Sequence, residues 1–60
     1  MIDTYRAWKA GGLWVLKLPD GGRRTFDTKG DLMDYLRSRE KRLTAPTETR
    51  KSFLVWEVYR

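Results

Sequence analysis

Two short glycine-containing turns divide the first half of the chain and constrain its fold more than any other feature. Gly11-Gly12 separates the β-forming segments Asp3–Lys9 and Leu13–Leu18, and Pro19-Asp20-Gly21 separates the second segment from Arg23–Phe26. Two adjacent glycines suit the positive φ angles of a two-residue hairpin turn. Pro-Asp-Gly is typical of a three-residue loop in which the glycine takes the left-handed position. We therefore predict three antiparallel strands whose pairing is set by these turns.

A helix and one further strand are expected after the turns. Asp27 or Thr28 can cap a helix over about Thr28–Arg42, in which leucines recur on one face at helical spacing. The polar, proline-containing segment Thr44–Arg50 indicates a loop, and the aromatic and β-branched segment Ser52–Tyr59 indicates a strand. The order β-β-β-α-β predicts a single small α+β domain, residues 1–60, with one amphipathic helix on one face of a small antiparallel sheet.

The predicted pairing places a row of cations on the face of the sheet that the helix leaves free. Arg6 lies opposite Lys17, Lys17 lies opposite Arg23, and Trp8 lies in the next row. Like charges directly opposite each other destabilise a sheet by some tenths of a kcal/mol. Such a row favours an anion that lies against it. Alternatively, the long side chains only keep the surface soluble, because salt screens the repulsion between their charges over about 8 Å.

The last predicted strand is apolar on both of its sides. Its side chains form two alternating sets, Phe53, Val55 and Tyr59 on one side and Leu54, Trp56 and Val58 on the other. A single helix covers only one face of a sheet, so a strand of this kind implies a second cover. We expect Leu54, Trp56 and Val58 to contact a partner, with a homodimer as the favoured cover. Alternatively, Trp56 lies half exposed, which aromatic rings tolerate.

The composition narrows the chemistry that the chain can support. Cysteine and histidine are both absent, which removes thiolate ligands, disulfides and the commonest general base. Asp27, Asp31 and Asp34 could be read as a Mg²⁺ cluster, but a helix cap and the helix dipole explain them better. We expect a protein that is not an enzyme and that uses no cofactor and no metal.

The net charge of +5 favours anionic partners, either nucleic acid or an acidic protein surface. No apolar run is long enough to span a membrane, and the first residues lack the apolar core of a signal peptide. These features predict a cytoplasmic protein without a membrane partner. Its size is typical of small bacterial or phage-encoded proteins.

The segment Gly12–Leu36, GLWVLKLPDGGRRTFDTKGDLMDYL, resembles the N-terminal arm-binding domains of phage and transposon integrases. More distantly, it resembles the plant ethylene-response-factor DNA-binding domain. The shared pattern is carried by Gly12, Trp14, Gly21, Gly22, Arg23, Arg24, Phe26, Thr28 and Lys29. The resemblance implies a three-stranded sheet that enters the major groove of DNA, with the helix packed behind it.

Together these observations predict a small basic module that binds nucleic acid, with DNA favoured, through one face of its sheet. The residues expected to make contact are Arg6, Trp8, Lys17 and Arg23, with Arg24 and Lys29 near the rim. The alternative is a phage or bacterial protein-interaction module, such as an inhibitor or adaptor. It would dock a partner through Trp8, Trp56 and the last strand, for example by strand addition.

Overall fold

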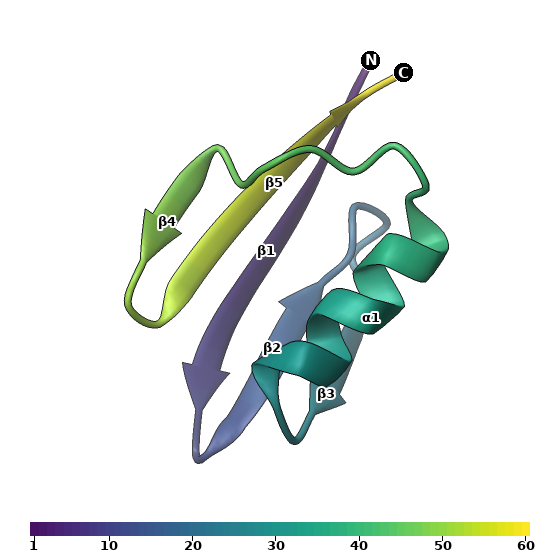
Figure 1. Ribbon diagram of the computed structural model, residues 1–60. Helices are drawn as coiled ribbons and strands as arrows, with labels where there is room; N and C mark the ends of the chain where they lie inside the picture. Colours follow the sequence, from purple (N-terminus) through teal and green to yellow (C-terminus); the bar gives the residue numbers. More distant parts are fainter.

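The computed structural model contains five strands and one helix (Figure 1). The elements are β1 (Ile2–Ala10), β2 (Leu13–Lys17), β3 (Arg23–Phe26), α1 (Lys29–Arg39), β4 (Glu48–Arg50) and β5 (Phe53–Tyr59). All neighbouring strands are antiparallel and form one sheet in the order β3-β2-β1-β5-β4. The expected α+β class, with one helix packed against an antiparallel sheet, is confirmed.

Both turns have the geometry that their sequences predict. Gly11 and Gly12 have φ angles of 58° and 81°, as a two-residue hairpin turn of this type requires. In the second turn Gly21 has a φ of 92°, and the Leu18 N–H donates to the Gly22 carbonyl at 2.8 Å. The Asp20 carboxylate accepts from the Gly22 N–H, also at 2.8 Å. The two turns therefore hold β1, β2 and β3 in the predicted register.

The helix begins where the sequence indicates but ends earlier. The Thr28 hydroxyl accepts from the Asp31 N–H at 3.1 Å and caps the first turn. The helix was expected to reach Arg42, whereas it ends at Arg39, because Glu40 takes an extended conformation with φ −120° and ψ 95°. This conformation turns the Glu40 side chain inward to Tyr5, and Leu43 then packs on the core from outside the helix.

The last third of the chain differs most from expectation. Thr44–Arg50 was expected to be a loop, but Glu48–Arg50 forms β4 and pairs with β5. Strand β5 pairs with β1 on its other side, from Ile2↔Tyr59 to Trp8↔Phe53, so β1 is the central strand. Strand β4 thus bonds to backbone groups of β5 that would otherwise form the edge of the sheet.

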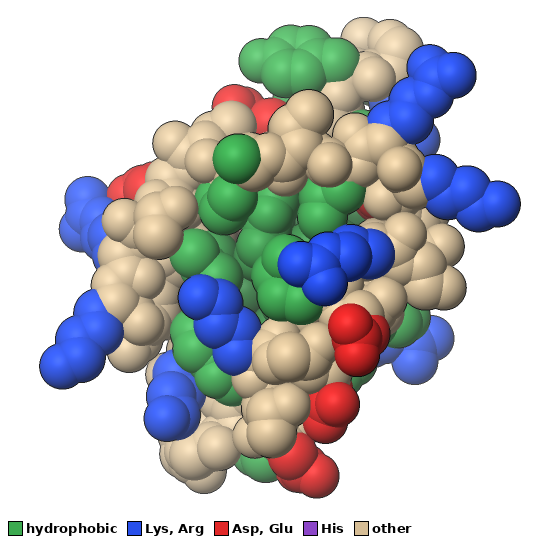
Figure 2. Space-filling model, in the orientation of Figure 1, with side chains coloured by type: hydrophobic (Ala, Val, Ile, Leu, Met, Phe, Trp, Pro, Cys, Tyr) green, Lys and Arg blue, Asp and Glu red, His purple; other side chains and the backbone are tan.

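The core lies between the sheet and the helical side of the molecule. It consists of Tyr5, Ala7, Trp14, Leu16, Leu18, Leu32, Leu36, Leu54 and Trp56. The helix lies over β2 and β3, and the segment that follows it crosses the same face near β5 (Figure 1). Because this cover is incomplete, hydrophobic side chains remain visible between the helix and strands β1 and β5 (Figure 2).

Candidate nucleic-acid interface

The sheet has one face that neither the helix nor the segment 40–47 covers (Figure 1). Because Tyr5 and Ala7 point into the core, the alternation of a strand places Arg6 and Trp8 on this uncovered face. The registers then order its central side chains in two rows that run across the strands. The first row is Arg23, Lys17, Arg6, Val55 and Glu48, and the second is Thr25, Val15, Trp8, Phe53 and Arg50.

The first row contains the cations that the sequence predicts, and we call Arg6, Lys17 and Arg23 the basic row. Arg6 pairs with Lys17 across β1 and β2, and Lys17 pairs with Arg23 across β2 and β3. Arg6 and Arg23 are exposed, and Lys17 is half-buried. The ion pairs of the protein join other residues, so no carboxylate neutralises the basic row. An anion would meet three unpaired cations here.

The second row has an apolar and aromatic centre. Val15, Trp8 and Phe53 are neighbours on β2, β1 and β5, and all three are half-buried. The Lys9 N–H donates to the Ser52 carbonyl at 3.2 Å, so the preceding pair, Trp8 and Phe53, is a non-hydrogen-bonded pair. In such pairs the Cα atoms are only about 4.5 Å apart and the side chains lie close together. We call Trp8 and Phe53 the aromatic pair.

The two rows are in contact through Arg23. Its guanidinium carbon lies over the Trp8 ring, 5.8 Å from the ring centroid. A guanidinium in this position is attracted by the negative face of the ring, by about 0.5–1 kcal/mol at an exposed site. Arg23 therefore stacks on Trp8 and keeps its charge available.

The two rim residues lie elsewhere. Arg24 lies opposite the buried Leu16 and points to the helical side, where its guanidinium carbon lies 5.1 Å from the Tyr35 ring centroid. Lys29 is the first residue of α1 and is exposed. The structure therefore brings Arg6, Trp8, Lys17 and Arg23 together on one face and leaves Arg24 and Lys29 outside it.

The expectation for the last strand is corrected. Leu54 and Trp56 are only 2% and 1% exposed, because they pair with Ala7 and Tyr5 and point into the core. Val58 is half-buried and packs against the same core. These side chains were expected to contact a partner, but two of them are not at the surface. The residues of β5 that do reach the uncovered face include Phe53 and Val55, which the sequence pattern did not single out.

A hollow of about 470 Å³ adjoins the basic row at Arg6 and Lys17. It lies between the first residues of β1 and the β2–β3 turn, because β2 ends at Lys17 and leaves Ile2–Tyr5 paired only with β5. The alternation of antiparallel bonds directs the backbone N–H and C=O groups of Ile2 and Thr4 toward it. The basic row thus adjoins a recess that offers backbone donors and acceptors and that Asp3 and Asp20 also line.

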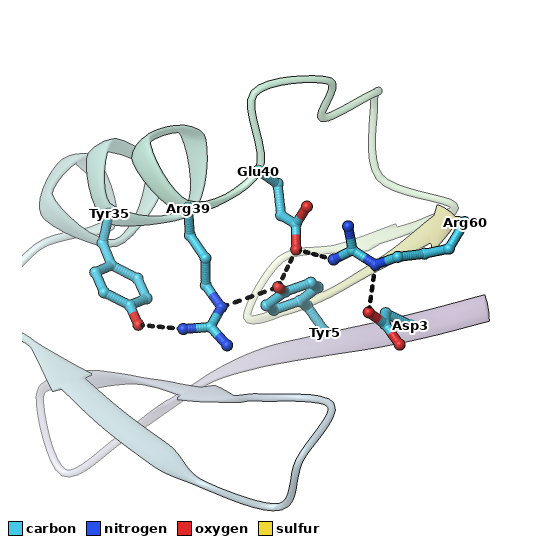
Figure 3. Close-up of polar contacts among 6 residues, drawn as sticks. All are labelled: Asp3, Tyr5, Tyr35, Arg39, Glu40 and Arg60. Atoms are coloured by element: carbon cyan, nitrogen blue, oxygen red, sulfur yellow. Dashed lines mark hydrogen bonds and ion pairs between the residues drawn. The ribbon is translucent and has the colours of Figure 1, made fainter. Parts of the chain in front are cut away.

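A second polar cluster lies on the helical side (Figure 3), with Tyr5 and Glu40 buried and Arg39 and Arg60 exposed. The Glu40 carboxylate accepts hydrogen bonds from the Tyr5 hydroxyl and from the Arg60 guanidinium. The Arg60 Nε donates to Asp3 at 2.6 Å, and the Arg39 Nε donates to the Tyr5 oxygen at 3.1 Å. These bonds connect both ends of the chain to the end of the helix. We assign the cluster a structural role, because its charged groups are engaged with one another.

Because of this cluster, we expect the free energy of unfolding to fall at high pH. Burial, and then the hydrogen bond to Glu40, raise the pKa of Tyr5 above its ordinary value of 10.0. Above about pH 10 the unfolded chain loses the Tyr5 proton before the folded protein does, so the free energy of unfolding falls until the raised pKa is passed. Urea titrations from pH 9 to 12 should show a smaller decrease for Tyr5→Phe than for the parent protein.

Tyr59→Phe is the matched control for this comparison, because Tyr59 is 73% exposed. It should retain the decrease seen in the parent protein. Equal decreases in the parent and in Tyr5→Phe would show that this hydroxyl does not carry the effect.

No family model, no curated protein and no solved structure matches this chain. The only helix has 11 residues and is neither long nor apolar enough to cross a bilayer.

Proposed function

We propose that the protein binds DNA through the uncovered face of its sheet. The observation that carries this proposal is the basic row, in which Arg6, Lys17 and Arg23 lie side by side without an acidic partner. Opposed cations cost a sheet some stability. A polyanion that lies across them converts this cost into affinity, because each neutralised phosphate releases bound counterions.

The distribution of charge on this face supports the same proposal. Glu48 and Arg50, near the β4 edge, neutralise each other in an ion pair at 2.9 Å. Glu57, the other carboxylate on this face, lies opposite Thr4 in the row beyond Arg6 and Val55. The unpaired positive charge is therefore concentrated over β1, β2 and β3, with Glu57 at its β5 side. A potential of one sign over part of a surface steers an oppositely charged partner to that part.

Fewer observations support the protein-interaction alternative. Strand addition needs a free edge, whereas β5 is an internal strand with β1 on one side and β4 on the other. Trp56 is in the core. Of the two tryptophans on which that alternative relied, only Trp8 is at the surface, and Trp8 belongs to the face proposed for DNA.

A charge-matched pair of triple variants tests the proposal. Binding of labelled DNA is measured by fluorescence anisotropy over a range of salt concentrations. Three phosphate contacts predict a slope of log K against log salt of about −2 to −3. Replacing Arg6, Lys17 and Arg23 by glutamine should lower the affinity by about tenfold or more at low salt and should remove most of this slope.

The control variant carries glutamine at Arg37, Lys41 and Arg42, which are exposed at and after the end of the helix. It loses the same three charges but keeps the basic row, so its affinity and slope should remain close to those of the parent. Circular dichroism confirms that both variants are folded. Equal losses in both variants would mean that net charge, and not the basic row, attracts DNA.

A further inference from the structure

We propose that this face takes single-stranded DNA, with two successive bases stacked on the aromatic pair Trp8 and Phe53. The inference rests on the proposed function and specifies the form of DNA that the face accepts.

The width of the sheet disfavours entry into a duplex. Strands in a sheet are about 4.8 Å apart, so a three-stranded sheet is about 10 Å wide between its outer strands. The major groove of DNA is about 12 Å wide. The sheet of this protein has five strands, which makes it about 19 Å wide, and β1, with two members of the site, is the central one. Strands β5 and β4 would therefore meet the groove wall before Arg6 and Trp8 reached the bases.

The aromatic pair can stack on the faces of bases, which are accessible in a single strand and hidden in a duplex. In a duplex the faces of the bases are stacked within the helix, whereas in a single strand they are free to stack on aromatic side chains. Trp8 and Phe53 are close neighbours on an uncovered face, and both retain accessible surface. The Arg23 guanidinium over Trp8 adds a second planar group on which a base can stack.

The spacing of the two rows allows one to hold the phosphates of a DNA strand and the other to hold its bases. Alternate residues along a β-strand are about 7 Å apart, which separates the basic row from the aromatic pair. Phosphates on Arg6, Lys17 and Arg23 would then place their bases over Trp8 and Phe53. The path runs across the strands and stops near β4, because the first row continues beyond Arg6 with the neutral Val55 and the acidic Glu48. The footprint is a few nucleotides long.

The same rows favour DNA over RNA. A site specific for RNA contacts the ribose 2′-hydroxyl with donors or acceptors. The charged side chains of the two rows are already engaged in this proposal, Arg6, Lys17 and Arg23 with phosphates and Arg50 with Glu48. Thr25, at the outer strand β3, is the only neutral polar side chain in the two rows. The centre of the face, around Trp8 and Phe53, has none.

Fluorescence reports binding at this face directly, because Trp8 is the one tryptophan on it. Trp14 and Trp56 are 8% and 1% exposed and belong to the core. A labelled oligothymidine should quench the emission of the parent protein and should bind about tenfold or more tightly than a duplex of equal length. Trp8→Ala and Phe53→Ala should each weaken oligothymidine binding by about fivefold or more.

Two further variants separate stacking from a general loss of surface. Trp8→Phe keeps an aromatic ring, so it should retain most of the affinity while it loses the quenching. Tyr59→Ala removes a ring that is 73% exposed, pairs with Ile2 and lies away from both rows, so it should bind like the parent. Circular dichroism verifies the fold of each variant.

The possible failures are distinguishable. Duplex binding as tight as oligothymidine binding, sensitive to the basic-row triple variant but not to Trp8→Ala, overturns the single-strand inference and leaves the proposed function standing. Absence of binding to either form of DNA overturns both. Tighter binding of oligouridine than of oligothymidine overturns the choice of DNA.

Discussion

Replacing Trp56 by alanine is expected to leave a large fraction of the protein molecules unfolded. Trp56 is 1% exposed, lies opposite Tyr5 on the central strand and is the largest fully buried side chain. Truncation of a buried tryptophan to alanine costs about 3–5 kcal/mol. A domain of this length has a free energy of unfolding of about 3–9 kcal/mol. Urea denaturation followed by circular dichroism measures the loss.

Trp56→Phe is the matched comparison. The indole Nε1–H of Trp56 is buried without a hydrogen-bond partner, and an unsatisfied buried donor costs about 1–3 kcal/mol. Phenylalanine removes this donor and keeps most of the ring, so the two effects partly cancel and the variant should lose at most about 2 kcal/mol. A Trp56→Ala protein as stable as the parent would show that this side chain is not part of the core.

The second large effect is expected for Glu40→Ala, with a loss of about 2–3 kcal/mol. The carboxylate accepts from both Tyr5 and Arg60, and its side chain is 8% exposed. Its removal leaves the buried Tyr5 hydroxyl without an acceptor and breaks one of the two side-chain links between the helix end and β1, while the bond from Arg39 to Tyr5 remains. The cost stays below that of a fully buried ion pair, because Arg60 is 46% exposed and keeps its bond to Asp3.

Two comparisons isolate this effect in urea titrations. Glu40→Gln keeps an acceptor at the same place and should lose less stability than Glu40→Ala. Glu48→Ala removes one partner of the surface pair with Arg50 and should cost only about 0.2–1 kcal/mol. If Glu40→Ala and Glu48→Ala lose equal stability, then the buried cluster contributes no more than an ordinary surface ion pair.

The turns explain why so much of the first half could be predicted. Gly11-Gly12 and Pro19-Asp20-Gly21 each permit few backbone conformations, and the side-chain alternation of a strand then determines which residues share a face. The predicted pairs Arg6↔Lys17 and Lys17↔Arg23 are present, and so is the Thr28 cap. Local chemistry was sufficient for these features.

The remaining differences arise from tertiary contacts that local sequence does not report. Strand β5 is apolar on both sides, so only its pairing with β1 decides that Trp56 is buried and that Phe53 joins the candidate site. Glu40 follows two basic residues of the helix end and looks like another surface charge. Its burial depends on Tyr5, 35 positions away. The three residues of β4 are too few and too polar to show a strand pattern.

The position of β1 also has a consequence for synthesis of the chain. Strand β1 is synthesised well before its partner β5, because β2, β3, α1 and β4 lie between them in the chain. Strands β1, β2 and β3 and the helix connect near neighbours and can form early. Until β5 emerges, one edge of β1 has no partner. An unpaired edge is where a growing chain is most open to pairing with another chain. Pairing with β5 closes this edge of β1.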